Sequence, residues 1–257
     1  MFSPLRSRPG FVAALVGLLL CCLFATAVGP QQTAAQDKEA GKKTPRVQST
    51  NNLKRITLAM YSYDNAHKCF PAHAIYSNDG KMPLLSWRVA ILPYLGQEAL
   101  YKEFKLDQPW DSEHNKKLIS RMPKVYDCSA APEKVSKEGK TFYQVFTGEL
   151  NESVFPRANR CTRINQITDG TSNTILAVEA KEPVVWTKPE DLAIPKDQKK
   201  MPAVGGLFKE GFNVAFCDGV VYFFRPDPPA TELRALVTPN GGEDVFADLG
   251  KLLQKEN

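Results

Sequence analysis

The clearest pattern in the chain is a pair of short apolar runs on either side of Asp218-Gly219. Residues 211–224 read GFNVAFCDGVVYFF. An Asp-Gly pair between such runs is typical of a β-hairpin with a two-residue type I′ turn. Side chains alternate across a strand, so this register predicts one wholly apolar face. That face would carry Phe212, Val214, Phe216, Val221 and Phe223.

A helical period comes earlier in the chain. Apolar side chains recur at helical spacing, with Lys54 and Arg55 on the polar side. We expect the helix to end near His67, because Pro71 follows soon after. A short hairpin is not stable alone, so the helix is the expected cover for its apolar face. The helical stripe consists of Leu53, Ile56, Met60 and Tyr63.

The remaining patterns predict an α+β fold. Residues 86–121 contain several short helical segments, and residues 231–237 contain another. Residues 141–147 and 174–178 are rich in β-branched and aromatic side chains, which favour strands. Helices come first and strands later, which predicts an N-terminal helix packed on an antiparallel β-sheet, with a helical insertion.

The first 27 residues have the layout of a secretory signal peptide. Arg6 and Arg8 precede an uncharged apolar run over residues 11–24, and Ala25-Thr26-Ala27 is a small-x-small cleavage pattern. The run is shorter than the ~20 apolar residues of a transmembrane helix, which disfavours an uncleaved membrane anchor. We expect no stable membrane span after the signal peptide is cleaved. We expect a polar spacer over residues 28–48, a single domain over 49–246 and a C-terminal tail over 247–257.

The charge of the chain bears on its possible partners, and its cysteine content bears on possible disulfides. The formal net charge is +5, and no stripe of basic residues interleaved with aromatic ones is visible, so no nucleic-acid partner is expected. Four cysteines remain after signal cleavage, which permits two disulfides in three connectivities or free thiols. Cys69 and Cys161 each flank a loop and are the pair to test first. The candidate disulfide cysteines are Cys69, Cys128, Cys161 and Cys217.

No catalytic or cofactor-binding constellation emerges from the polar residues. His67, Cys69 and His73 form a cluster that would suit zinc, but a fourth ligand is missing nearby, so we predict an incidental loop and no metal. Asp169 and Asp218 each precede glycine, and turn formation explains both. We expect His114 to be a solvated side chain on a helix, and Ser172 lacks the Gly-x-Ser-x-Gly context of a nucleophile elbow.

The three tryptophans form a weak candidate surface for a ligand or partner. Tryptophan offers a large apolar face together with one hydrogen-bond donor. The alternative, which we favour, is that these side chains pack the loops onto the sheet. The residues are Trp87, Trp110 and Trp186.

Four blocks of sequence carry a family resemblance. They are Asn52-Leu53-Lys54-Arg55-Ile56, Ser86-Trp87-Arg88-Val89 with Leu92-Pro93-Tyr94-Leu95, Ile167-Thr168-Asp169-Gly170-Thr171-Ser172-Asn173-Thr174-Ile175, and Phe216-Cys217-Asp218-Gly219. A fifth consists of Leu233-Arg234-Ala235-Leu236 with Asn240-Gly241-Gly242-Glu243.

With these blocks in this order, the chain resembles a paralogous family of unknown function that is expanded in planctomycete bacteria. The family is known as domain of unknown function 1559, also labelled SBP_bac_10. The resemblance implies a pilin-like or pseudopilin-like organisation. Many members carry a histidine ten residues before the Asp-Gly turn, where this chain has Phe208.

The resulting hypothesis is an exported, non-enzymatic cell-envelope protein that acts as an interaction or assembly component of pilin-like type. The alternative is an exported solute- or glycan-binding module that uses the tryptophan-bearing loops. The sequence identifies no partner, and other envelope proteins are the candidates.

The signal-peptide prediction can be tested directly. We expect cleavage after Ala27, because the small residues at 25 and 27 suit the signal peptidase. N-terminal sequencing of the exported protein checks the site. Recovery of the intact Met1 end in a membrane fraction would contradict the cleaved-signal prediction.

Overall fold

The computed structural model describes residues 44–243 and 246–253, and the first element in this range is a long helix. The predicted signal peptide and most of the predicted spacer lie outside these residues. Helix α2 (Pro45–His67) starts within the predicted spacer, since Thr44 caps it and Pro45 occupies its first turn. It ends at the predicted residue, and Lys68 follows with a left-handed φ of 65°.

Short helices and strands follow α2 along the chain. The helices are α3 (Trp87–Ala90), η1 (Leu92–Leu95), α4 (Glu98–Glu103), η2 (Asn115–Arg121), η3 (Lys124–Tyr126), α5 (Glu133–Lys137), η4 (Ile164–Gln166), α6 (Ala230–Val237) and α7 (Phe246–Leu252), where η marks a 3₁₀ helix. The strands are β1 (Ala74–Tyr76), β2 (Pro83–Ser86), β3 (Lys140–Gln144), β4 (Phe146–Gly148), β5 (Phe155–Pro156), β6 (Ile175–Val185), β7 (Leu192–Ala193), β8 (Phe212–Phe216) and β9 (Val221–Phe224).

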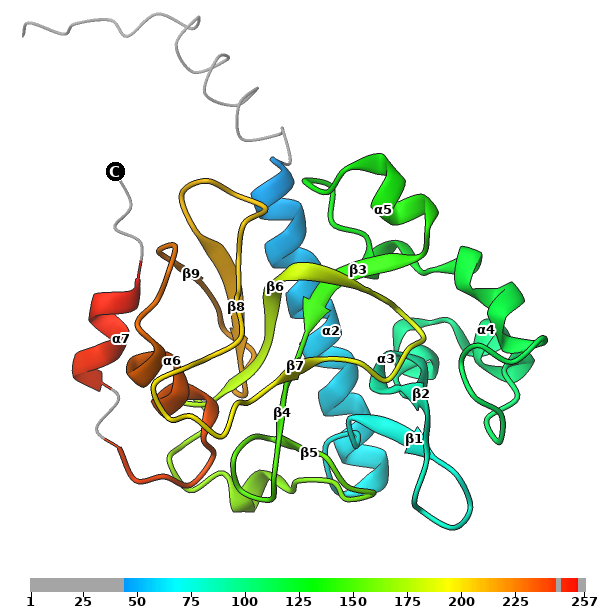
Figure 1. Cartoon of the computed structure of the whole chain (residues 1–257), viewed down its shortest axis with the longest axis horizontal. Coiled ribbons are helices and arrows are strands. Elements are labelled where there is room, and N and C mark those ends of the chain that lie inside the picture. The colour runs from blue at the N-terminus through cyan, green and yellow to red at the C-terminus, as the bar shows by residue number, and fades with distance from the viewer. Residues whose placement is uncertain (1–43, 244–245, 254–257) are drawn as a thin grey trace, which may run out of the picture. The chain divides into compact units, whose positions relative to one another are not determined.

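The principal sheet has four antiparallel strands in the order β3-β6-β8-β9, and α2 passes behind it (Figure 1). This arrangement confirms the predicted α+β class with an N-terminal helix and an antiparallel sheet. The helical insertion is present as α3, η1, α4 and η2. The strands β1 and β2 form a hairpin of their own, and β5-β4-β7 form a small parallel sheet. Two of these three parallel strands have only two residues, too few for a recognisable sequence pattern.

The hairpin turn differs from the prediction by one residue. The loop contains three residues, because Phe216 and Val220 form the last bonded pair. Of the turn residues, only Gly219 has a positive φ, at 89°, and Asp218 Oδ1 accepts a hydrogen bond from the Val220 N–H at 2.9 Å. A type I turn followed by a left-handed glycine is the usual three-residue hairpin loop.

This shift exchanges the side chains of β9 between the two faces of the sheet. Val214 lies opposite Tyr222, and Ala215 lies opposite Val221. The predicted apolar face is therefore wrong for Val221 and Phe223. The observed face consists of Phe212, Val214, Phe216, Tyr222 and Phe224.

The predicted cover is also wrong, because α2 packs on the opposite face. The predicted stripe is buried, with Tyr63 partly so, but it shares a cluster with the small residues Ala177, Ala215 and Cys217. Small side chains let a helix approach a sheet closely, so α2 packs on the face that carries them. The large aromatic rings on the other face are covered by α6 and α7. The covering side chains, which belong to the same hydrophobic cluster as the rings, are Leu233, Leu236, Val237 and Leu252.

The predicted C-terminal tail is likewise part of the fold. Leu252 is fully buried, and its carbonyl accepts a hydrogen bond from the Arg225 N–H at 2.9 Å. Leu253 forms a one-residue bridge with Phe224 at the end of β9. A seven-residue helix is too short for its amphipathic pattern to distinguish it from a tail.

Three Leu→Ala substitutions test both covers of the sheet. Leu53→Ala and Leu252→Ala should each lower the free energy of unfolding by about 2–5 kcal/mol, because both leucines are fully buried. Leu58→Ala is the matched control on α2, where the leucine is 66% exposed, and should cost less than about 0.5 kcal/mol. Denaturant unfolding measures all three. A harmless Leu252→Ala would mean that α7 does not cover the sheet.

Candidate functional site

The Ser86-Trp87-Arg88 block forms the polar centre of the structure. Ser86 ends β2 and caps α3, and its Oγ accepts a hydrogen bond from the Arg88 N–H at 3.2 Å. The cap starts α3 so that the Arg88 side chain points into the domain. The backbone carbonyl of Arg88 accepts a hydrogen bond from Tyr126 Oη at 2.8 Å. Arg88 and Trp87 are both fully buried, and the guanidinium carbon lies 4.6 Å from the centre of the Trp87 ring.

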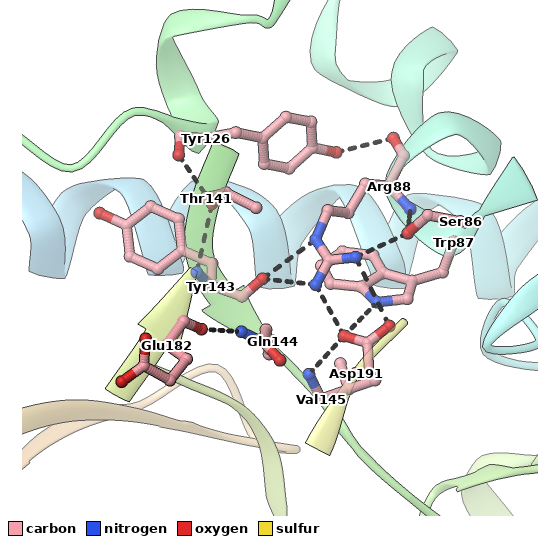
Figure 2. Close-up of polar contacts among 10 residues, drawn as sticks. All are labelled: Ser86, Trp87, Arg88, Tyr126, Thr141, Tyr143, Gln144, Val145, Glu182 and Asp191. Atoms are coloured by element: carbon pink, nitrogen blue, oxygen red, sulfur yellow. Dashed lines mark hydrogen bonds and ion pairs between the residues drawn. The ribbon is translucent and has the colours of Figure 1, made fainter. Parts of the chain in front are cut away.

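Arg88 forms a buried ion pair with Asp191, in the loop before β7 (Figure 2). Arg88 Nη2 lies 2.7 Å from Asp191 Oδ1, and both side chains are 0% exposed. Nε and Nη2 also donate to the Tyr143 carbonyl at 3.0 and 2.8 Å, and Nη1 donates to Ser86 Oγ at 2.7 Å. Asp191 Oδ1 accepts further hydrogen bonds from Trp87 Nε1 at 3.2 Å and the Val145 N–H at 3.0 Å.

A substrate has no access to this ion pair, because both side chains are fully buried. Burial raises the pKa of Asp191, while the charge of Arg88 and the donated hydrogen bonds oppose the rise. Each polar atom of the pair is used within the protein, so the pair joins the helical insertion to β3 and to the segment that leads into β7.

A second buried network surrounds Glu179 on β6. Its carboxylate accepts hydrogen bonds from the Asn213 N–H at 2.7 Å, from Asn213 Nδ2 at 3.0 Å and from Ser49 Oγ on α2. Ser49 Oγ also lies 2.8 Å from Tyr143 Oη, which in turn accepts from Asn52 Nδ2 at 3.3 Å. Within the described residues, Glu179 forms no ion pair. The network therefore fixes α2 against β6 and β8 by hydrogen bonds to one fully buried carboxyl group.

A third polar group lies in a cleft at the C-terminal end of α2. The rings of Tyr63 and His67 stack at a centroid distance of 4.0 Å, and His67 Nε2 lies 3.1 Å from Tyr94 Oη. The cavity volume is about 490 Å³. We call this the tyrosine cleft. Its polar lining residues are Tyr63, His67, Tyr76, Tyr94, Tyr101 and Asn159.

The histidine and cysteine cluster separates in the structure. Cys69 forms a disulfide with Cys161, with a Cα–Cα distance of 5.7 Å, so its thiol is not available to a metal. His67 belongs to the tyrosine cleft, whereas His73 is buried with Nδ1 3.0 Å from the Pro156 carbonyl oxygen. In the described part of the chain, no group of three or more His, Cys, Asp and Glu side chains could hold a metal ion. Cys128 and Cys217 are buried free thiols.

The tryptophans do not form the candidate ligand surface. Trp87 and Trp186 are fully buried and belong to the main hydrophobic cluster, where each ring lies near Tyr126. Trp186 Nε1 donates to the Ile119 carbonyl at 2.9 Å, so even its polar atom is used internally. Trp110 is partly buried, and Lys188 Nζ lies 5.5 Å from its ring centre.

The two Asp-Gly positions have different roles. Asp218 serves the hairpin turn, as described above. Asp169 instead joins two sequence blocks, since its carboxylate accepts from the N–H groups of Gly241 at 2.7 Å and Gly242 at 3.0 Å. His114 is half-buried, and its Nε2 lies 2.7 Å from the Glu103 carbonyl oxygen. Turn formation alone is therefore an incomplete account of Asp169.

Sequence reasoning missed the two buried networks and the tyrosine cleft. Glu179 offered one signal, an acidic residue inside the apolar strand run TILAVEA. Arg88 offered a comparable signal, a charge within WRVAIL. The four tyrosines of the cleft lie on separate elements, so no local spacing could have indicated their proximity.

The amino-acid sequence matches a protein family whose function is unknown. Residues 43–205 match the family model SBP_bac_10, described as a protein of unknown function (DUF1559). No curated protein and no solved structure matches the chain. The matched range covers α2, both buried networks except Asn213, and the tyrosine cleft, and it ends before β8.

The Glu179 network predicts a pH-dependent stability. Burial raises the pKa of Glu179 above its ordinary value of 4.5, so the folded state retains a proton that the unfolded state loses. The free energy of unfolding should therefore fall as the pH rises from about 4.5 through the raised pKa, by up to about 1.4 kcal/mol per pH unit.

Glu179→Gln is the variant that isolates this effect, because glutamine does not titrate. Denaturant unfolding from about pH 4 to pH 8 should show the stability of the wild type declining relative to the variant as pH rises. Asp191 is present in both the wild type and the variant, so its contribution to the pH dependence cancels in the difference between their free energies of unfolding. A difference that stays constant over this range would contradict a raised pKa for Glu179.

Proposed function

The chain belongs to the DUF1559 family (SBP_bac_10), whose function is unknown, and on this premise we propose an exported, non-enzymatic cell-envelope protein. In this proposal the chain acts as an interaction or assembly component, and it docks through the exposed edge strand β9. The partner is an extended segment of another envelope protein.

Two features support export. The N-terminal 27 residues have the pattern of a signal peptide. The Cys69–Cys161 disulfide is of the kind that persists in oxidising compartments such as the periplasm. Of the helices that the structure describes, none has both the length and the apolar content to cross a bilayer.

The edge position of β9 is the observation that carries the docking proposal. β9 is the last strand of the four-stranded sheet, beside β8 (Figure 1). Because the Phe216 N–H donates to the Val220 carbonyl, bonded pairs alternate along the ladder. The N–H and C=O groups of Val221 and Phe223 consequently face away from β8. An exposed edge of this kind can accept an added strand.

An apolar side chain at the start of this edge supports a contact surface. Val220 is 41% exposed where β9 begins. The hairpin turn lies against α2, since a Cβ at Gly219 would be 4.0 Å from Thr57 Cγ2. At the other end of β9, the bridge between Phe224 and Leu253 limits the available edge to about three residues.

Charge substitution tests the docking surface. Val220→Lys should remove the protein from its native envelope complex, because a lysine at an exposed edge opposes strand addition. Leu150→Lys is the matched control, since Leu150 is 54% exposed in a loop that is not part of this edge. Size fractionation of solubilised envelopes measures the association.

Site-specific photo-crosslinking locates the contact. A photoreactive amino acid at position 220 should give partner adducts that are absent when it is placed at position 150. Adducts from position 150 alone, or association that survives Val220→Lys, would contradict docking through β9.

A further inference from the structure

We propose that the tyrosine cleft binds a neutral sugar residue of a glycan. The proposal does not rest on docking through β9, and the two sites share no residue. It uses a different part of α2, because the hairpin turn lies near Thr57 whereas the cleft includes Tyr63 and His67.

The charge of the lining selects a neutral ligand. None of the residues that line the cleft is Asp, Glu, Lys or Arg. A charged ligand would lose hydration on entry without gaining an ionic partner, and this loss is costly in a partly enclosed site. Phosphorylated, sulfated and uronic-acid ligands are therefore disfavoured by the chemistry of the walls.

The aromatic rings select a ligand with both an apolar face and polar groups. A pyranose ring presents C–H groups on its faces and hydroxyl groups around its rim, and tyrosine has the complementary combination of ring and hydroxyl. Tyr63, Tyr76, Tyr94 and Tyr101 are all half-buried in the cleft wall. Each side chain therefore keeps part of its surface accessible to a ligand, while Tyr63 and Tyr94 already pack edge to face at a centroid distance of 5.8 Å.

The hydroxyl groups in the cleft favour a sugar over a hydrocarbon. Within the part of the chain that the structure describes, the hydroxyls of Tyr63 and Tyr101 make no hydrogen bond to the protein. Asn159 adds a side-chain amide to the lining. A purely apolar ligand would exclude water from these groups without replacing its hydrogen bonds, whereas sugar hydroxyls replace them.

The disulfide links two of the chain segments that line the cleft. Cys69 lies in the chain between the lining residues His67 and Ala72, and Cys161 lies two residues after Asn159. The covalent bond therefore links the two segments that carry these residues. A wall that is ordered before binding loses less conformational entropy on binding, which favours affinity for a small ligand.

The experiment is a calorimetric titration of the mature protein, residues 28–257, with four neutral probes. The probes are cellotetraose, chitotetraose, mannotetraose and maltotetraose. At least one should bind saturably, and tetragalacturonate, as a charged counterpart, should not. Failure of all four neutral probes to bind would overturn the proposal, whatever the outcome of the β9 crosslinking.

Cleft variants separate binding at the tyrosines from binding elsewhere. Tyr101→Ala should weaken the best probe at least tenfold, and Tyr101→Phe, which keeps the ring and removes the hydroxyl, about threefold or more. Tyr222→Phe is the matched control, because Tyr222 packs in the second hydrophobic cluster outside the cleft. Unchanged affinity in both Tyr101 variants would overturn the proposal.

Thermal unfolding and peptide competition complete the test. Thermal unfolding should show that Tyr101→Phe folds like the wild type, so that any loss of affinity reflects the hydroxyl group. A proline-rich peptide is the competing occupant, since aromatic grooves also bind polyproline II segments. Saturable binding of such a peptide, with competition against the bound tetrasaccharide and greater affinity, would assign the cleft to peptides instead.

Discussion

The buried ion pair between Arg88 and Asp191 is the interaction on which the arrangement of the domain depends. Removing two charges from water costs several kcal/mol per ion, and only complete hydrogen bonding offsets this cost. The structure meets this requirement with acceptors and donors from several segments, including Ser86, the Tyr143 carbonyl and the Val145 N–H. The helical insertion, β3 and the segment before β7 must therefore reach their places together, because an incomplete set would leave a charge buried without its partners.

Tyr143 connects this ion pair to the attachment of α2. Its carbonyl accepts two hydrogen bonds from Arg88, whereas its hydroxyl belongs to the network of Ser49 and Glu179. One residue of β3 thus contacts both the insertion and the long helix. The small side chains of Ala177 and Ala215 bring α2 close enough to the sheet for these hydrogen bonds to form. Packing and polar bonding reinforce each other here, since neither would hold the helix at the same position alone.

The sequence blocks of the family are used chiefly to build the fold. The Ser86-Trp87-Arg88 block makes the ion pair, Asp218-Gly219 makes a turn, and Asp169 joins its own block to Gly241 and Gly242. These polar side chains are satisfied by internal partners and offer little to a ligand. Recognition is therefore better sought at the edge of β9 and in the tyrosine cleft, which retain unused polar groups next to apolar ones.

Local sequence patterns were enough to identify the elements whose signals span only a few residues. The stripe of α2, the end of that helix at His67 and the strand character of residues 174–178 follow from periodicity and propensity. Long-range packing settled the other features. A three-residue turn in place of a two-residue turn moved Val221 and Phe223 to the other face, and the sizes of side chains far apart in sequence decided which face α2 covers. Arg88 and Asp191 are 103 positions apart, and the tyrosines of the cleft come from separate elements. Such contacts form only when distant segments pack together, because the free energy that selects them comes from burial and hydrogen bonding across the whole domain.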